Sequence, residues 1–324
     1  MEVIDFRGLP GAGPVPSVNP VIEVGNLSKR YGETVAVDGL SFTVRPGQVT
    51  GFLGPNGAGK STTMRLMLGL DRPSAGRVLI DGEPFARLTR PLRRVGALLE
   101  ANSAHRGRRA RDHLLWLARS NQIPVTRVPE VLELVGLGDV ARRRPKGFSL
   151  GMTQRLGIAA ALLGDPPVLL LDEPVNGLDP EGIVWLRNLI KELAAGGRTV
   201  FLSSHLMSEM ALTADHLIVI GRGRLLADTS MAGFIGANTR SHVHIRTPEP
   251  ARMRDVLAAA GVTVRQAPDG ALEADVSEPA KVGELAAAHR LVVHEIAVRT
   301  ASLEETFMRL TGDTVDHRAE GRRR

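Results

Sequence analysis

One segment near the start of the chain constrains its fold more than any other. The segment matches the pattern G-x-x-x-x-G-K-[ST] with Gly54, Pro55, Asn56, Gly57, Ala58, Gly59, Lys60 and Ser61. A β-type run at 49–53 precedes it and a helical pattern at 61–68 follows it, as a phosphate-binding loop requires. In such a loop the backbone N–H groups and the helix N-terminus attract phosphate oxygens, Lys60 reaches the β- and γ-phosphates, and Ser61 offers a hydroxyl to Mg²⁺. A plain glycine turn before a helix is the alternative.

A second group of candidate residues follows two apolar runs further along the chain. The run at 168–171 ends in Asp172 and Glu173, and the run at 199–202 is followed by His205. Asp172 is placed to hold Mg²⁺ through water, and Glu173 to orient and deprotonate an attacking water. His205 could hydrogen-bond the γ-phosphate and that water. Adjacent acids can also merely end a strand, and a lone histidine there is usually structural, so a structural role stays open.

The succession of patterns predicts an α/β fold with more than one domain. Short β-type runs begin at residue 21, and helical periodicity then alternates with apolar runs, which predicts a mainly parallel core sheet. The mostly helical stretch at about 92–165 is expected to be an inserted subdomain. Beyond residue 236 the order β-α-β-β-α-β predicts a small ferredoxin-like α+β domain at 237–312. Residues 1–20 are expected to form a flexible leader, and 313–324 a basic tail.

Composition excludes several classes of protein. Of the 324 residues, 43% are hydrophobic, which is enough to bury a core. The chain has no cysteine, so disulfide scaffolds, thiol nucleophiles and cysteine-ligated zinc or iron–sulfur sites are excluded. No segment approaches the roughly 18 consecutive apolar residues of a membrane span, and Glu2 and Asp5 stand where a signal peptide carries basic residues. We therefore expect a soluble, cytoplasmic protein.

A segment just upstream of the run that ends in Asp172 and Glu173 resembles a motif that is specific to one known protein family. Residues 148–155 read Phe-Ser-Leu-Gly-Met-Thr-Gln-Arg and resemble the signature segment of ATP-binding cassette (ABC) transporters, usually written L-S-G-G-Q. With the motifs above, residues 21–235 resemble the nucleotide-binding subunit of such a transporter. Ser149 and Gly151 keep the pattern, whereas Leu150 and Met152 depart from it. Ser149 also suits a helix N-cap, which is its structural alternative.

The resemblance implies a fold, cofactors and further site residues. The implied fold is a P-loop NTPase cassette with a mainly parallel core sheet, an antiparallel β subdomain and an inserted helical subdomain. The cofactors are ATP and Mg²⁺, and the expected Mg²⁺ residues are Ser61, Asp172 and Glu100, the last in the place of the family's glutamine. Tyr31 is expected to stack on adenine, although a half-buried strand-end aromatic is its alternative. The remaining expected ATP contacts are those of the phosphate loop together with Thr62, Ser149, Gly151 and Asp179.

The resemblance also implies partners. In the family, two cassettes sandwich two ATP molecules head to tail, so we expect a homodimer or a pseudo-symmetric dimer. The chain is most similar to the exporter branch that includes daunorubicin and bacitracin resistance systems. This similarity implies an ATPase that energises a separate transmembrane permease, exports a drug-like, antibiotic or lipid-like substrate, and lies on the inner face of the membrane. The alternative is a soluble ABC-type ATPase acting on nucleic acid or ribosomes. A P-loop small-molecule kinase would not explain Ser149 or His205.

Two remaining groups of residues allow either a structural or a functional interpretation. The first is an arginine cluster, which is either a solvated face or a contact for the permease or for anionic lipid: Arg87, Arg90, Arg93, Arg94, Arg106, Arg108, Arg109 and Arg111. The cluster flanks Glu100, where the family docks the permease, and this favours the partner interpretation. The second comprises His242, His244, His289 and His294, which we interpret as ordinary surface, with neither zinc nor nucleic acid expected.

Overall fold

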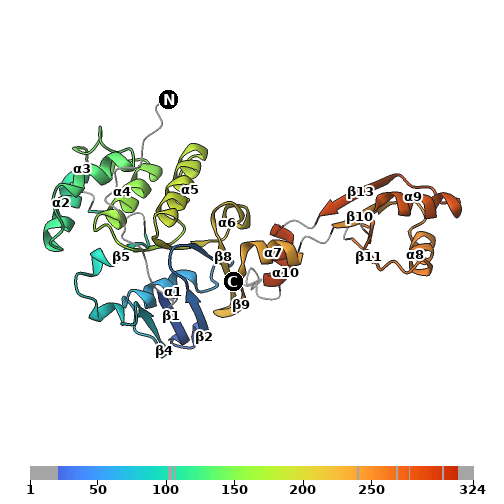
Figure 1. Ribbon diagram of the computed structural model, residues 1–324, viewed down its shortest axis with the longest axis horizontal. Coiled ribbons are helices and arrows are strands. Elements are labelled where there is room, and N and C mark those ends of the chain that lie inside the picture. Colours follow the sequence, from blue (N-terminus) through green and yellow to red (C-terminus); the bar gives the residue numbers. More distant parts are fainter. Residues whose placement is uncertain are drawn as a thin grey trace, which may run out of the picture. The chain divides into compact units, whose positions relative to one another are not determined.

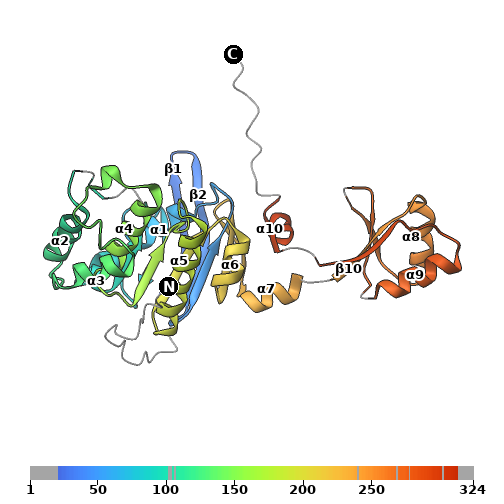
Figure 2. The same cartoon turned by 90° about the horizontal axis from the view of Figure 1, so that it is seen from above.

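The computed structural model describes residues 21–100, 104–105, 107–238, 241–267, 269–276, 278–300 and 303–312. The leader at 1–20, the tail at 313–324 and Arg106 lie outside the described residues. Contacts divide the chain into two compact units, and residues 232–310 form the second of them. Figures 1 and 2 show the elements of each unit from two directions.

The described part of the first unit contains two sheets. In the core sheet the order is β5 (Val95–Leu98), β6 (Val168–Leu171), β7 (Thr199–Ser204), β3 (Val49–Leu53), β8 (His216–Gly221) and β9 (Arg224–Ser230). Neighbouring strands are parallel except β8 and β9. Every residue of β3 and β6 is buried, which explains the unbroken apolar sequence of β6 and the mainly apolar sequence of β3. The predicted mainly parallel core sheet is confirmed.

The other sheet of the first unit is antiparallel. It comprises β1 (Ile22–Tyr31), β2 (Thr34–Val44) and β4 (Ala75–Ile80), in the order β2-β1-β4. Three phenylalanines join it to the core sheet, because the ring of Phe42 from β2 lies 5.7 Å from that of Phe52 and 5.9 Å from that of Phe201. This sheet is the expected antiparallel β subdomain.

The helices of the first unit fall into two groups by position in the chain. Between β5 and β6 lie α2 (Ala110–Ser120), α3 (Arg127–Leu134) and α4 (Leu150–Leu162), which pack on one another as Figure 1 shows. The other helices are α1 (Lys60–Met67), α5 (Pro180–Ala195) and α6 (Met207–Thr213), and α7 (Met231–Asn238) begins at the unit boundary. No helix in the described ranges is long and apolar enough to cross a membrane.

The second unit has the predicted order of elements. They are β10 (Ser241–Arg246), α8 (Pro250–Ala259), β11 (Val264–Gln266), β12 (Leu272–Ala274), α9 (Pro279–Ala288), β13 (Glu295–Thr300) and α10 (Leu303–Gly312). The strands are antiparallel in the order β11-β12-β10-β13, the ferredoxin-like order. Val243 and Ile245 of β10 pack with Met253 and Leu257 of α8 and Val282 of α9 to form its core. The ferredoxin-like fold predicted for this part of the chain is confirmed.

Candidate functional site

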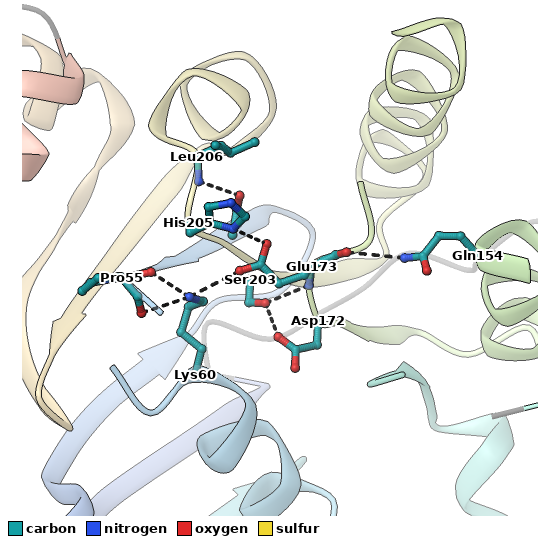
Figure 3. Close-up of polar contacts among 10 residues, drawn as sticks. Pro55, Lys60, Gln154, Asp172, Glu173, Ser203, His205 and Leu206 are labelled. Carbon is teal, nitrogen blue, oxygen red and sulfur yellow. Dashed lines mark hydrogen bonds and ion pairs between the residues drawn. The ribbon is translucent and has the colours of Figure 1, made fainter. Parts of the chain in front are cut away.

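The candidate residues gather at one edge of the core sheet. The parallel strands β3, β6 and β7 all end there, so the phosphate loop, the pair Asp172 and Glu173, and His205 are brought together from segments far apart in sequence. Figure 3 shows their side chains pointing toward one another. This is the edge at which open α/β sheets bind ligands.

The phosphate loop connects β3 to α1 with a backbone that only glycine adopts easily. Gly59 has φ +104°, and a Cβ atom on it would lie 2.5 Å from the carbonyl oxygen of Ala36. Gly57 has φ +80° and faces open space. A pocket opens beside the loop, and the residues lining it are Ala36, Asn56, Gly57, Gly59, Lys60, Ser61, Thr62 and Glu173. Five members of the predicted motif therefore reach one pocket, whereas Gly54, Pro55 and the buried Ala58 do not line it.

Lys60, the first residue of α1, is 6% exposed, yet its charge is compensated. Its Nζ donates to the carbonyl oxygens of Gly54 at 2.7 Å and Pro55 at 3.3 Å. It also lies 3.3 Å from Oε1 of Glu173. The ammonium group is thus held at the mouth of the loop by neutral and charged oxygens, which a phosphate could replace.

Glu173 links the phosphate loop to His205. Its Oε2 lies 2.8 Å from Nδ1 of His205, so the carboxylate bridges a lysine and a histidine. The backbone of Glu173 has φ +46°, in the left-handed region, although the residue is not glycine. Such conformations occur where surrounding contacts impose them and are frequent at functional sites.

Asp172 is buried beside Glu173 and is held by a residue that the sequence did not single out. The hydroxyl of Ser203 donates to Oδ1 of Asp172 and accepts the backbone N–H of Glu173 at 2.9 Å. The backbone N–H of Asp172 donates to the carbonyl oxygen of Leu98 at 2.7 Å, across the β5–β6 boundary. Glu100 follows β5 at this same edge and is exposed.

Three predicted ATP-contact residues that follow the phosphate loop in the sequence also lie outside the pocket lining. Ser149 is the N-cap of α4, and its Oγ accepts the backbone N–H of Met152 at 3.2 Å. Asp179 is the N-cap of α5, and its Oδ1 accepts the N–H of Gly182 at 2.9 Å. Gly151 packs close to Gly177, where a Cβ atom would lie 2.9 Å from the Gly177 carbonyl oxygen. The signature segment and the segment at 176–179 therefore lie side by side.

Tyr31 also lies outside the pocket lining and is 48% exposed. Its hydroxyl donates to Asp71 at 2.8 Å, and the ammonium of Lys29 lies 4.8 Å from the ring centroid. Desolvation and the Asp71 hydrogen bond raise the pKa of Tyr31, and hydrogen bonds from Arg65 and Tyr31 lower the pKa of Asp71. The hydrogen bond from the hydroxyl to Asp71 thus holds the Tyr31 ring in place, while the residue is about half exposed.

Part of the arginine cluster makes ordinary polar contacts. Arg94 pairs with Asp81, Arg93 donates to the carbonyl oxygen of Gln122, and Arg108 lies 4.8 Å from the ring centroid of Trp116. In the second unit, His242 lies 3.7 Å from Glu273 and His244 lies 3.8 Å from Asp269. The interpretation of the C-terminal histidines as surface is wrong for His244, which is buried and whose Nε2 has no hydrogen-bond partner within the described chain. No group of three or more potential metal ligands occurs among the residues that the structure describes.

Comparison with known proteins identifies relatives that match most of the chain. A family model described as ABC transporter matches residues 37–176, and one of a domain of unknown function (DUF8746) matches 241–304. An uncharacterized ABC transporter ATP-binding protein of Bacillus subtilis, YhcH, is 38% identical over 303 residues, which are 91% of this chain and 97% of that protein. The Nod factor export ATP-binding protein I of Paraburkholderia xenovorans is 37% identical, over 90% of this chain and 97% of its own. The bacitracin transport ATP-binding protein BcrA of Bacillus licheniformis is 44% identical, over 65% of this chain and 70% of its own.

Solved structures agree with these relatives. An ATP-binding subunit of an ABC transporter has a TM-score of 0.62 and 28% identity, and the match covers 67% of this chain and 92% of that chain. A dimeric ATP-binding cassette in a post-hydrolysis state, bound to ADP and Pi, has a TM-score of 0.60 and 25% identity, over 65% of this chain and 98% of its own.

Proposed function

This chain belongs to the ABC transporter family as an ATP-binding, ATP-hydrolysing subunit, and we propose that it powers export through a separate membrane permease. In this proposal residues 21–235 form the ATP-binding domain and 237–312 an accessory domain. The relatives named above are transport proteins, so an ATPase acting on nucleic acid or ribosomes is not favoured.

The observation that carries the proposed chemistry is the position of Glu173 between Lys60 and His205. When the γ-phosphate binds the ammonium group of Lys60, Oε1 of Glu173 loses its ion pair and can accept a proton from water. The water oxygen then bonds to the γ-phosphorus as the bond to the ADP oxygen breaks. His205, which donates Nδ1–H to Oε2, holds the carboxylate in place, and we assign it a contact to the terminal phosphate.

The donors at this edge suit Mg²⁺. Ser61 lines the pocket, and Asp172 is a buried carboxylate whose oxygens are hard ligands. Ser61, Asp172 and, from the end of β5, Glu100 would hold the ion. Bound there, Mg²⁺ would neutralise charge on the phosphate oxygens. The chain's own part is to fix these oxygens beside Lys60.

The residues outside the pocket lining support a dimer as the working form. Ser149 is exposed at the N-terminus of α4, where free backbone N–H groups favour an anion. We propose that Ser149 and Gly151 of one copy contact the γ-phosphate in the pocket of a second copy, and that the loop at 176–179 joins the two sites. A related cassette has been solved as a dimer with ADP and Pi. Tyr31 is assigned to adenine.

The direction of transport and the substrate class come from the relatives. Two of the relatives are named for bacitracin transport and Nod factor export, and a further relative, from Streptococcus pyogenes and 36% identical, is named for lantibiotic transport. We propose that this chain serves export of a substrate of that kind from the inner face of the cell membrane, where the permease would hold it. The arginines at 87–111 are proposed to face that partner.

The experiment compares Glu173→Gln with Glu192→Gln, a charge-matched control on the exposed side of α5. ATP hydrolysis and ATP binding are measured on the purified full chain, alone and co-isolated with its permease. We expect Glu173→Gln to bind ATP and to lose about 10²-fold or more in turnover, while Glu192→Gln behaves as wild type. Turnover at the wild-type rate in Glu173→Gln would overturn the assignment.

A further inference from the structure

The hydroxyl of Ser203 contacts both acidic residues of the site at once. Ser203 lies in β7 and is fully buried. A hydroxyl has one proton to donate and lone pairs that accept. Here the proton goes to Oδ1 of Asp172, and a lone pair takes the backbone N–H of Glu173 at 2.9 Å. One side chain therefore fixes the carboxylate of one acid and the backbone of the next.

The backbone that Ser203 holds is in a costly conformation. At φ +46°, a residue with a Cβ atom loses about 1–2 kcal/mol relative to a right-handed conformation, so other contacts must impose it. The N–H of Glu173 is held by Ser203, and its carbonyl oxygen accepts a longer bond, 3.4 Å, from Nε2 of Gln154. Gln154 makes its shorter bond, 2.9 Å, to the carbonyl oxygen of Pro174. The carbonyl oxygen of Glu173 also accepts the backbone N–H of Asn176 at 3.1 Å. The Ser203 contact is thus the shortest of the three on the Glu173 backbone and the one that holds its N–H.

The direction of the Glu173 side chain depends on this backbone. From the left-handed turn, its carboxylate reaches Lys60 at 3.3 Å and His205 at 2.8 Å, as Figure 3 shows. Without the hydroxyl, a partly buried N–H would lose its partner, and the peptide between Asp172 and Glu173 would be free to rotate toward another. A shift of about 1 Å in a catalytic group can lower a rate about 10²-fold.

We propose that Ser203 is a positioning residue for ATP hydrolysis, which aims Glu173 through its backbone and holds Asp172 through its carboxylate. The inference rests on the proposed role of Glu173 as the base. Lys60 and the phosphate loop bind nucleotide without Ser203, so loss of its hydroxyl lowers turnover and leaves nucleotide affinity unchanged.

The test uses the purified full chain and three replacements of Ser203. Ser203→Ala removes the hydroxyl, and Ser203→Cys replaces it with a weakly hydrogen-bonding thiol of nearly the same shape, so that the fold is kept if alanine is not tolerated. Ser203→Thr restores a hydroxyl in a residue suited to strands. The control is Thr50→Val in the neighbouring strand β3, because the buried Thr50 hydroxyl has no hydrogen-bond partner within the described chain.

Four quantities are measured for each variant: kcat, KM, the Kd of a non-hydrolysable ATP analogue, and Tm. We expect Ser203→Ala and Ser203→Cys to lose about tenfold to a hundredfold in kcat with the analogue Kd within about twofold of wild type. Ser203→Thr is expected to recover most of kcat despite a Tm lowered by its extra methyl group, and Thr50→Val to keep kcat.

Two results would overturn the inference. The first is a wild-type kcat in Ser203→Cys or Ser203→Ala while Glu173→Gln is inactive. In that case Ser203 is not a positioning residue, but the proposed function still stands. The second is a loss in Ser203→Thr equal to that in Ser203→Ala, because the effect would then follow packing instead of the hydroxyl. An active Glu173→Gln would instead remove the proposed base, and with it the basis of this inference.

Discussion

Nζ of Lys60 and Oε1 of Glu173 lie 3.3 Å apart at the mouth of the phosphate loop, so the two charges compensate each other. Both side chains are largely buried. In this arrangement the residue that would bind the γ-phosphate is already paired with the residue that would activate water. Nucleotide must therefore compete with Glu173 for the ammonium group before chemistry begins.

This competition predicts that Glu173→Gln binds nucleotide more tightly than wild type. The neutral amide competes less well for Lys60, and the gain should reach about fivefold, the equivalent of about 1 kcal/mol for one ion pair. Equilibrium titration with a non-hydrolysable ATP analogue measures it, with Glu192→Gln as the control. An unchanged or weaker Kd in Glu173→Gln would show that the ion pair does not oppose binding.

Two glycines of the phosphate loop should differ in their tolerance of a methyl group. Gly57→Ala places a Cβ in open space at φ +80°, so we expect only the conformational cost of about 1–2 kcal/mol. Gly59→Ala adds a clash with the Ala36 carbonyl oxygen at φ +104°, and its loss should be clearly larger. Urea unfolding of both variants gives the two free energies of unfolding. Equal decreases in the free energy of unfolding for the two variants would mean that the Ala36 backbone moves away from the new Cβ atom at no energetic cost.

The Tyr31 ring and its hydroxyl should contribute separately to nucleotide affinity. The hydroxyl is engaged by Asp71, and the ring is half exposed, so Tyr31→Phe should bind ADP within about twofold of wild type. Tyr31→Ala removes the stacking surface and should weaken binding by about 1–3 kcal/mol. Fluorescence titration with a labelled ADP distinguishes them. Wild-type affinity in Tyr31→Ala would exclude stacking on adenine.

Stability should fall with pH below about 6.5 because of His113. Burial, and then Arg108, lowers the pKa of His113, and its Nδ1 finds no hydrogen-bond partner among the described residues. The folded state therefore prefers the neutral ring, whereas the unfolded chain takes up a proton near pH 6.5. This contribution is complete above that pH and is lost as the pH falls toward the lowered value.

Replacing His113 with leucine should remove this part of the pH dependence. Urea unfolding at pH 7.5 and pH 5.5 measures the free energy of unfolding at each pH. The decrease in this free energy between pH 7.5 and pH 5.5 should be smaller for His113→Leu than for wild type. Equal losses in the two proteins would contradict a buried neutral His113.

The sequence predicted the parts of the site that carry a recognisable motif and missed Ser203, whose contact depends on strand register alone. The phosphate loop and the pair Asp172 and Glu173 are contiguous, so spacing alone revealed them. Ser203 is 31 residues from Asp172, and it meets Asp172 because Leu171 pairs with Leu202 in the parallel register of β6 and β7. Nothing local marks that pairing.

Strands with exposed faces also escaped the sequence patterns. The strand β4, Ala75–Ile80, has three exposed residues followed by a short apolar end, and β9, Arg224–Ser230, is exposed or half-buried throughout. Neither shows the alternation that identifies a half-buried strand. The buried strands β3 and β6, and the β-α-β-β-α-β order of the second unit, were predicted because burial leaves a continuous or periodic apolar pattern.

The central claim is that the pocket of one copy is completed by the start of α4 from another, and mixing two inactive variants tests it most directly. Lys60→Ala disables the pocket. Ser149→Asp keeps the helix cap but sets a negative charge toward the partner's phosphate. Each alone should be inactive, whereas an equal mixture should restore about a quarter of wild-type hydrolysis, because half of randomly paired dimers contain one intact site of two. A mixture as inactive as its components, or full activity in Ser149→Asp alone, would contradict the claim.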